Sequence, residues 1–406
     1  MKTSVYGIVV HSNTESAISK RLGCRRFWTR ALEKKANEER LNHEARNSIV
    51  GGKPKSSEFP AQNYCSDVTL HREHFKRLDN EDKLSRYKIV NTETNEEENL
   101  LTVALCNEKN RINELYFTAK SLERLAAEKG FKWMFITLTA PPKYHPNPIK
   151  GRRSYDHSVG VKGSHEYIKV LWTQIRAILN VRGVKASPEH YFGFRTVEPH
   201  KDGSFHWHLL IFANTDIQKK MTDAILEKFP GKNAAEIIYG KEGDGCASAA
   251  TYLYKYIAKS VSREKINYQN TVDSTKDCLR EEKDLASLRN KERVQASLKS
   301  MAIRQYQVFG VCNLTTIFKK INRLDLADLT APQGSILEFV KSSIWRNTDG
   351  YLNMMKNADL FGSDTEIRLI TVATLSSYGE PKKKVIGIRI GTVDFINHTT
   401  YKIVKS

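Results

Sequence analysis

Apolar positions in the middle of the chain follow two spacings. Repeats of three to four residues predict helices, and alternation at period two predicts strands. After a helix over 110–129, the pattern predicts a strand over 133–139, a helix over 164–182 and two strands over 190–198 and 205–213. A helix over 216–228, a strand over 235–239 and a helix over 248–261 follow. This order is typical of a ferredoxin-like α+β domain with an antiparallel sheet.

The flanking segments are more polar. We expect helices over 15–48 and 66–87, a linker over 50–63 and a loop over 91–99. Later come a charged exposed helix or partly disordered arm over 263–300, an apolar helical stretch over 301–330, and two hairpin strands over 367–375 and 384–392. These patterns divide the chain into four predicted regions. They are a basic, mostly helical region at 1–99, a central domain at 100–262, a charged helical region at 263–330, and a small α/β region at 331–406.

Two histidines stand in the most regular of the predicted strands. His206 and His208 alternate with bulky apolar residues, so both side chains project from one face. If Lys201–Gly203 is a three-residue hairpin loop with Gly203 in the left-handed conformation, Glu198 falls opposite His206 on that face. A two-residue loop would place Glu198 on the other face. Two imidazoles and one carboxylate, with positions left open, suit Mg²⁺ or Mn²⁺. The alternative is two half-buried core histidines beside a surface glutamate.

Two tyrosines share one face of the predicted helix over 248–261. Tyr252 and Tyr256 are four residues apart, and Lys255 and Lys259 flank them on the same polar side. A phenol oxygen can attack a phosphodiester, and nearby positive charge favours both the phenolate and the oxyanions of the transition state. Tyr254 points elsewhere. The alternative is an aromatic stripe packed on a neighbour, which explains the lysines poorly.

Other residues are candidates for contacts with a polyanion. Thr137 and Thr139 share one face of their predicted strand, although threonine is common in strands by propensity alone. Arg152 and Arg153 lie in a long loop over 145–163 that could hold single-stranded DNA or simply face solvent.

The composition of the chain indicates which kinds of partner the protein has and excludes some classes of protein. The chain has 406 residues, a net charge of +19 and a pI near 9.5, which indicates a polyanionic partner. Its six cysteines show no Cys-x-x-Cys spacing, which fits a reducing cytosol and argues against a zinc ribbon. No apolar run approaches the roughly 18 residues of a membrane span, so no membrane partner is expected. A phosphate-binding Gly-x-x-x-x-Gly-Lys motif is absent from the sequence.

Three motifs in this order resemble those of the bacteriophage replication gene A proteins, which are rolling-circle initiators of the HUH endonuclease superfamily. The motifs are the threonine-rich strand end at 134–142, the metal motif at 198–208 and the paired-tyrosine helix. The stretches 25–28, 301–307 (which contains Arg304) and 379–387 are also similar to parts of that family. The resemblance implies a palm-like sheet with the histidines on a central strand and the tyrosine helix across that face.

The resemblance also implies a function. It predicts an enzyme that nicks and rejoins a specific origin on single-stranded or supercoiled DNA through a 5′-phosphotyrosine intermediate. Host helicase and polymerase would then act on the product in the cytoplasm of the bacterial host. His206, His208 and Glu198 would hold the metal; Tyr252, Tyr256 and Lys255 would act in catalysis; Lys259, Arg152, Arg153, Thr137, Thr139 and Arg304 would contact DNA. The alternatives are a plasmid initiator or conjugative relaxase of the same superfamily, a non-catalytic basic DNA-binding protein, or a metal oxygenase, which the charge disfavours.

Overall fold

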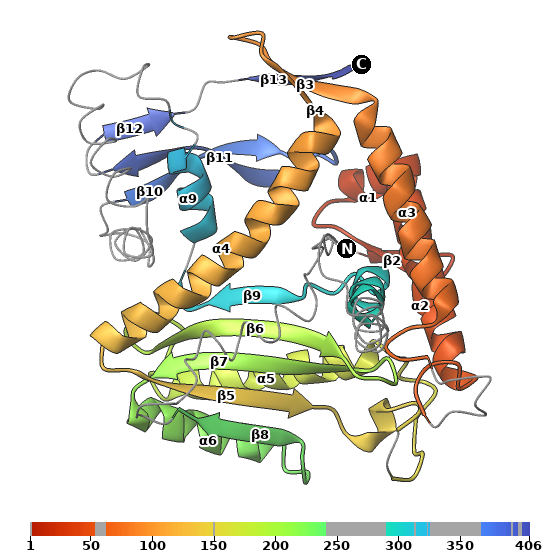
Figure 1. The fold of residues 1–406 in the computed structure, drawn as a ribbon, viewed down its shortest axis with the longest axis vertical. Helices are drawn as coiled ribbons and strands as arrows, with labels where there is room; N and C mark the ends of the chain where they lie inside the picture. Colours follow the sequence, from red (N-terminus) through yellow and green to blue (C-terminus); the bar gives the residue numbers. More distant parts are fainter. Residues whose placement is uncertain are drawn as a thin grey trace, which may run out of the picture.

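A five-stranded antiparallel sheet lies at one end of the computed structural model (Figure 1), in the order β8-β5-β7-β6-β9. The structure describes residues 2–52, 62–148, 151–240, 290–311, 314–322, 324, 367–390, 393–396 and 400–406. The strands are β5 (Lys132–Thr139), β6 (Tyr191–Pro199), β7 (Phe205–Ala213), β8 (Ala235–Tyr239) and β9 (Tyr306–Phe309). Helix α5 (Gly163–Val181) follows β5, and α6 (Thr215–Lys228) follows β7. The predicted β-α-β-β-α-β order is confirmed, and the histidine strand β7 is central.

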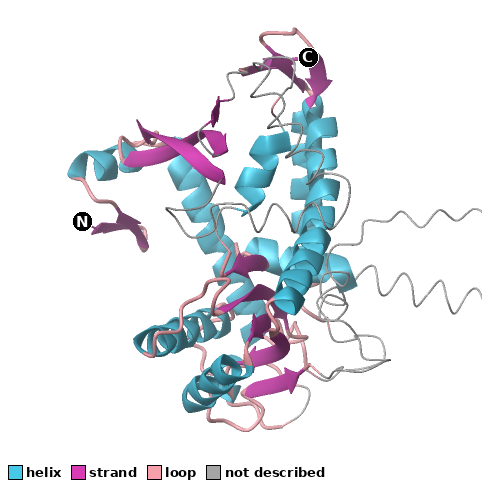
Figure 2. Ribbon diagram, turned by 90° about the vertical axis from the view of Figure 1, so that its left-hand side faces the viewer, coloured by secondary structure: helices cyan, strands magenta, loops and turns pink. Residues whose placement is uncertain are grey.

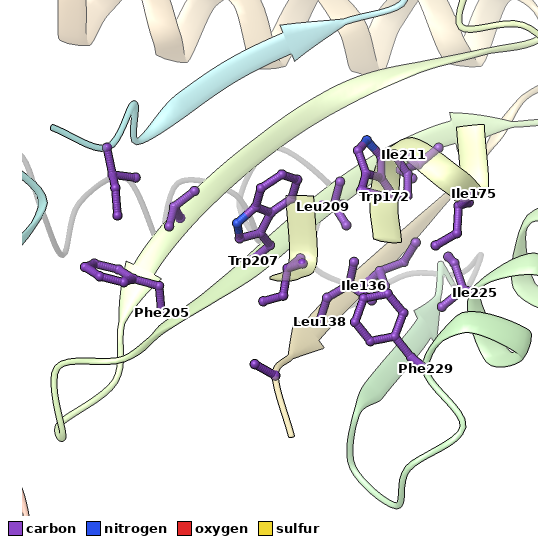
Figure 3. Close-up of a cluster of buried hydrophobic side chains, with 14 of the residues drawn as sticks. Ile136, Leu138, Trp172, Ile175, Phe205, Trp207, Leu209, Ile211, Ile225 and Phe229 are labelled. Atoms are coloured by element: carbon purple, nitrogen blue, oxygen red, sulfur yellow. The ribbon is translucent and has the colours of Figure 1, made fainter. Parts of the chain in front are cut away.

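The two faces of the sheet are covered by different helices. Strict alternation along β7 sends Trp207, Leu209 and Ile211 into a core shared with α5 and α6 (Figure 3). It sends Leu210 and Phe212 into a second core under α4 (Leu100–Glu128), on the opposite face (Figures 1 and 2). Each fully buried large side chain contributes about 1.5–3 kcal/mol. Because both faces are covered, the register of β7 is strongly fixed.

The N-terminal region forms a helical layer beside the sheet (Figure 1). A hairpin of β1 (Lys2–Val5) and β2 (Ile8–His11) leads into α1 (Glu15–Leu22), α2 (Arg25–Arg46) and α3 (Asp67–Ser85). The hydroxyl of Thr14 accepts from the amide of Ala17 and starts α1, and Ser66 starts α3 in the same way. The helices predicted over 15–48 and 66–87 are therefore confirmed, the first as two helices.

Two smaller sheets complete the fold (Figure 1). One has the order β13-β3-β4, from Tyr401–Lys405, Tyr87–Asn91 and Glu97–Asn99. The loop predicted over 91–99 is therefore wrong at its ends. Asn91 ends β3, which pairs with the distant β13, and Glu97–Asn99 form β4, which pairs with β3. The other sheet has the order β10-β11-β12, from Ile367–Leu375, Pro381–Ile390 and Val393–Ile396. The C-terminal hairpin predicted for this region is confirmed by the pairing of β10 with β11.

Residues far apart in the sequence meet where this C-terminal hairpin turns. The carboxylate of Glu380 accepts hydrogen bonds from Arg21 at 2.5 and 3.1 Å and from the hydroxyl of Ser12 at 2.5 Å. The ring of Tyr378 lies 4.6 Å from the guanidinium carbon of Arg21. We call this contact the Arg21–Glu380 clasp. It joins the first helix to the β10–β11 hairpin.

The structure corrects two predictions after residue 289. Residues 290–300 are helical but not exposed: Arg293, Val294, Ala296 and Leu298 are buried. The guanidinium of Arg293 donates to the carbonyl of Cys65 and so docks this helix on the N-terminal region. The stretch over 301–330 is not helical throughout, because residues 306–309 form strand β9 before α9 (Leu314–Asn322). Pairing with β6 outweighs local helix propensity there. Residues 263–289, 312–313, 323 and 325–330 of these segments lie outside the described residues.

The short 3₁₀ helix Pro142–Tyr144 follows β5 and opens the loop over 145–163 that was expected from the sequence. No helix in the described ranges combines the length and the apolar character needed to cross a membrane. The division of the chain into four regions stays a prediction.

Candidate metal centre and its surroundings

The hairpin between β6 and β7 has the register expected from the sequence. Glu198 pairs with His206, and Pro199 pairs with Phe205. The amide of His200 donates to the carbonyl of Ser204 at 2.6 Å, which closes a three-residue loop. Gly203 has φ +84, a conformation that favours glycine. The predicted placement of Glu198 on the histidine face is thus confirmed.

Three ligand atoms converge on this face. Nε2 of His206 lies 2.7 Å from Nε2 of His208. An Oε2 atom of Glu198 lies 3.7 Å from the first nitrogen and 3.5 Å from the second. Three atoms at these separations share a point roughly 2 Å from each, which is the coordination distance of small divalent cations. The three residues therefore fit a metal ion, and they form a group suited to metal binding within the described part of the chain.

Thr137 supports one of the candidate ligands. It pairs with His208 across β5 and β7, and its hydroxyl oxygen lies 3.1 Å from Nδ1 of His208. An Nδ1–H that donates to this oxygen would leave Nε2 of His208 with its lone pair toward the metal point. Thr139, which pairs with His206, has no such side-chain bond recorded. Nδ1 of His206 is buried without a hydrogen-bond partner among the described residues.

A buried polar lock holds the hairpin loop. The ring of His145 contacts Asp202 at 3.1 Å and Ser204 at 3.0 Å through Nδ1, and the carbonyl of Ala140 at 3.1 Å through Nε2. Asp202 also accepts from the hydroxyl of Ser204 at 2.6 Å and from its amide. Burial lowers the pKa of His145, but the hydrogen bond and charge of Asp202 outweigh it and hold the pKa above 6.5. The ring of His145 and the carboxylate of Asp202 thus fix the loop that sets Glu198 opposite His206.

His200 joins this lock to the candidate ligands. Its ring lies 4.0 Å from the ring of His206 and 4.9 Å from that of His145. Burial, and then the neighbouring His206 and His145, hold the pKa of His200 well below 6.5. Sequence reasoning used neither His200 nor His145. The sequence did contain a signal for His200, because this residue stands two positions after Glu198 and so continues the same face. His145 lies in a loop, where no periodic pattern could have indicated its role.

The N-terminal region packs directly against the loop. The amide of Tyr64 donates to the carbonyl of Lys201 at 3.0 Å. A Cβ added at Gly51 would lie 2.5 Å from Cα of Asp202, so only glycine allows this close approach. The hairpin is therefore held from the sheet side by His145 and from the other side by Gly51 and Tyr64.

The candidate DNA-contact residues lie in different settings. Arg152 and Arg304 are exposed. Arg153 donates to the carbonyl of Arg46 at 3.1 Å, which ties the 145–163 loop to the end of α2. Thr137 faces His208, as described above, and Thr139 is half-buried beside it. The structure thus brings the threonines, but not the three arginines, to the metal centre. Lys255, Lys259, Tyr252 and Tyr256 lie outside the described residues.

Comparison with known proteins identifies relatives but no structural match. No solved structure matched the chain significantly. The replication protein of Haemophilus phage HP1 is 25% identical over 382 residues, which cover 91% of this chain and 46% of that protein. The replication gene A protein of Escherichia phage P2 is 29% identical over 216 residues, 49% of this chain and 28% of that protein. A probable replication endonuclease from a prophage-like region of Salmonella typhi is 25% identical over 308 residues, 72% of this chain and 35% of that protein.

The chain therefore spans less than half the length of these relatives. The sequence profile of the bacteriophage replication gene A proteins matches residues 3–307, which include the complete β6–β7 hairpin and all three candidate metal ligands. The chain belongs to the bacteriophage replication gene A protein family.

Proposed function

We propose that this protein is a site-specific, metal-dependent DNA-nicking and rejoining enzyme that initiates rolling-circle replication at a phage origin. The observation that carries the proposal is the convergence of Glu198 on β6 with His206 and His208 on β7, two neighbouring inner strands of an antiparallel sheet. Several relatives are named as probable replication endonucleases, and these names support the proposal. In this proposal the sheet is the palm-like core of an HUH nuclease domain.

In this proposal one group of side chains would bind the metal, and a second group would hold those ligands in position. Mg²⁺ or Mn²⁺ held by Glu198, His206 and His208 would polarise the scissile phosphate. Thr137 would keep the ring of His208 oriented, and the His145–Asp202 lock would keep the hairpin in register. Each acts on the geometry of the ligand set and does not touch the reacting atoms.

The covalent step belongs to the tyrosine helix. The phenol oxygen of Tyr252 or Tyr256 would form a bond to the phosphorus of the scissile phosphate as the bond to the 3′ oxygen breaks. The products would be a 5′-phosphotyrosine link and a free 3′-hydroxyl, which host polymerase can extend. Lys255 would stabilise the negative charge on the phosphate oxygens. The second tyrosine would cleave the strand again when the replication fork returns. The 3′-hydroxyl freed there would attack the first phosphotyrosine, which would rejoin the ends and release the first tyrosine.

DNA would be held by the basic surface of the protein. The net charge of +19 favours a polyanion, and Lys259, Arg152, Arg153, Arg304 and Thr139 are the proposed contacts. The partners would be origin DNA, a host helicase and a host polymerase in the bacterial cytoplasm.

The test is a covalent adduct. Supercoiled DNA that carries the phage origin is incubated with the protein and Mg²⁺, and the products are separated on a denaturing gel. We expect a protein-linked nicked circle that disappears in His206→Ala and in the double variant Tyr252→Phe/Tyr256→Phe. Tyr254→Phe is the matched control and should keep the adduct. An adduct that survives in the double variant, or that maps to Tyr254, would overturn the proposed mechanism.

A further inference from the structure

A buried arginine lies on the face of the sheet opposite the metal centre. Arg195 of β6 pairs with Leu209, whose side chain faces α5 and α6, whereas His206 and His208 face the other way. Arg195 is 8% exposed. Its guanidinium carbon lies 4.4 Å from the ring centroid of Trp207, and its Nη2 donates to the carbonyl of Arg304 at 2.9 Å.

This cation has no recorded carboxylate partner among the described residues. Burial and the charge of Arg304 lower its pKa to about 10, so it remains protonated at neutral pH. Nε of Arg195 is buried and has no hydrogen-bond acceptor in the described part of the chain. Of the two nitrogens whose state is defined, Nη2 has a backbone carbonyl as its acceptor and Nε has none, although the guanidinium as a whole lies against an aromatic ring. A buried charge of this kind is normally paired with an anion.

Further donors surround Arg195. The amide of Val197 donates to the carbonyl of Gln305 at 2.9 Å, which places Gln305 diagonally across from Arg195 in the β6–β9 register. Nε2 of Gln305 is also buried without a partner among the described residues. Arg304 is exposed, and its Nε donates to the carbonyl of Tyr306 at 3.1 Å, which fixes its side chain beside the cluster.

The other titratable groups nearby do not supply the missing anion. His165 lies against Trp207, whose indole N–H donates to its Nδ1 at 3.0 Å. Burial, and then the charge of Arg195, lower the pKa of His165 to about 4, so this ring is neutral. Glu166, the nearest acid in the chain to His165, is ion-paired with Lys169 at 3.0 Å. The cluster therefore has two positive charges, two unused buried donors and no recorded negative charge.

We propose that Arg195, Arg304 and Gln305 form a second phosphate-binding site, which holds a phosphate of the DNA strand away from the scissile position. The DNA assignment rests on the proposed function, whereas the anion site rests on the side chains alone. The exposed Arg304 gives a ligand its route to Arg195. Strand β9 is the edge of the described sheet, and in this proposal the DNA strand would pass around that edge between the metal face and the cluster. The same chemistry would also accept free phosphate or a nucleotide.

Two measurements distinguish a DNA phosphate from free phosphate or a nucleotide as the ligand, and neither requires DNA cleavage. The first is thermal unfolding in sodium pyrophosphate and in sodium chloride at equal ionic strength. The second is the salt dependence of binding to a single-stranded oligonucleotide in EDTA. The variants are Arg304→Gln, whose exposed position leaves the fold intact, and Gln305→Met, which removes the unused donor at similar volume. Arg182→Gln, an exposed arginine at the end of α5, is the matched control.

For the wild type and Arg182→Gln we expect pyrophosphate to raise the unfolding temperature above that in chloride. We expect this gain to shrink in Gln305→Met and to disappear in Arg304→Gln. The slope of log affinity against log salt should fall by about 0.7 in Arg304→Gln, the loss expected for one phosphate contact on single-stranded DNA.

The possible results lead to different conclusions. Pyrophosphate stabilisation that all variants keep would overturn the anion site. Stabilisation lost with an unchanged salt slope would overturn DNA as the ligand and indicate free phosphate or a nucleotide. If both effects appear but the wild type forms no covalent adduct with origin DNA, the proposed nicking function fails and the phosphate site stands.

Discussion

Replacing Thr137 by valine tests whether this residue orients a metal ligand. Valine has nearly the shape of threonine and suits a strand, so the substitution removes the hydroxyl that lies 3.1 Å from Nδ1 of His208 and little else. In the bound state the ring N–H would lose its acceptor, and the ring would lose its fixed orientation. Loss of such a supporting hydrogen bond typically weakens metal affinity about 10–100-fold. That range corresponds to roughly 1.4–2.8 kcal/mol of binding free energy.

The assay is titration with Mn²⁺, followed by the electron paramagnetic resonance signal of the free ion. Thr139→Val is the matched control, because Thr139 lies on the same strand face without a recorded bond to a histidine. We expect its affinity to stay within about twofold of the wild type, well below the effect of losing a supporting hydrogen bond. Equal Mn²⁺ affinity in Thr137→Val and the wild type would refute the reasoning. If affinity for single-stranded DNA fell instead, Thr137 would be a DNA contact, as first expected from the sequence.

Three other substitutions probe the fold and the site. Glu198→Gln keeps the side-chain shape but removes the charge, so Mn²⁺ affinity should fall at least about tenfold in the same titration; unchanged affinity would remove Glu198 from the ligand set. Gly193→Ala should lower the free energy of unfolding in urea by about 1–3 kcal/mol, since the new Cβ would lie 2.1 Å from the carbonyl oxygen of Leu210; an unchanged midpoint would contradict the tight β6–β7 contact. Because the pKa of His145 is raised in the folded protein, its protonation adds stability that is fully present below pH 6.5 and is lost as the pH rises through the folded-state pKa. Asp202→Asn removes the cause of the raised pKa. The free energy of unfolding should therefore fall less between pH 6.5 and 8.5 in this variant than in the wild type. The same fall in both proteins would disprove the lock.

The sequence predicted the central sheet well because its pattern is local. In β7 every second side chain enters one core, so both the strand and its face can be predicted from nine residues. The loop closed by Gly203 then fixed Glu198 opposite His206. The weaker elements depend on partners far away in the chain. Strand β3 is short and pairs on one side with the nearby β4 and on the other with β13, more than 300 residues later. No local pattern carries information about the pairing with β13.

Side-chain roles were harder to predict than positions. Serine is a common helix cap and Ser164 stands at the predicted start of α5, but the helix begins at Gly163, and the Ser164 hydroxyl accepts instead from the amide of Phe205 at 2.8 Å. It therefore joins α5 to the start of β7. His145 lies in a loop with no periodicity, and its place in the lock follows from tertiary contacts alone. The residues predicted on the tyrosine helix lie outside the described part of the chain, so their roles stay predictions.

The Arg21–Glu380 clasp has a consequence for folding during translation. Its two partners are 359 positions apart, so Glu380 leaves the ribosome roughly 20–70 s after Arg21 at synthesis rates of about 5–20 residues per second. Over that time α1 has neither its ion pair nor the ring of Tyr378 to cover it. Contacts of such long sequence separation slow folding. Helix α1 therefore completes its packing only after the turn of the β10–β11 hairpin has been made.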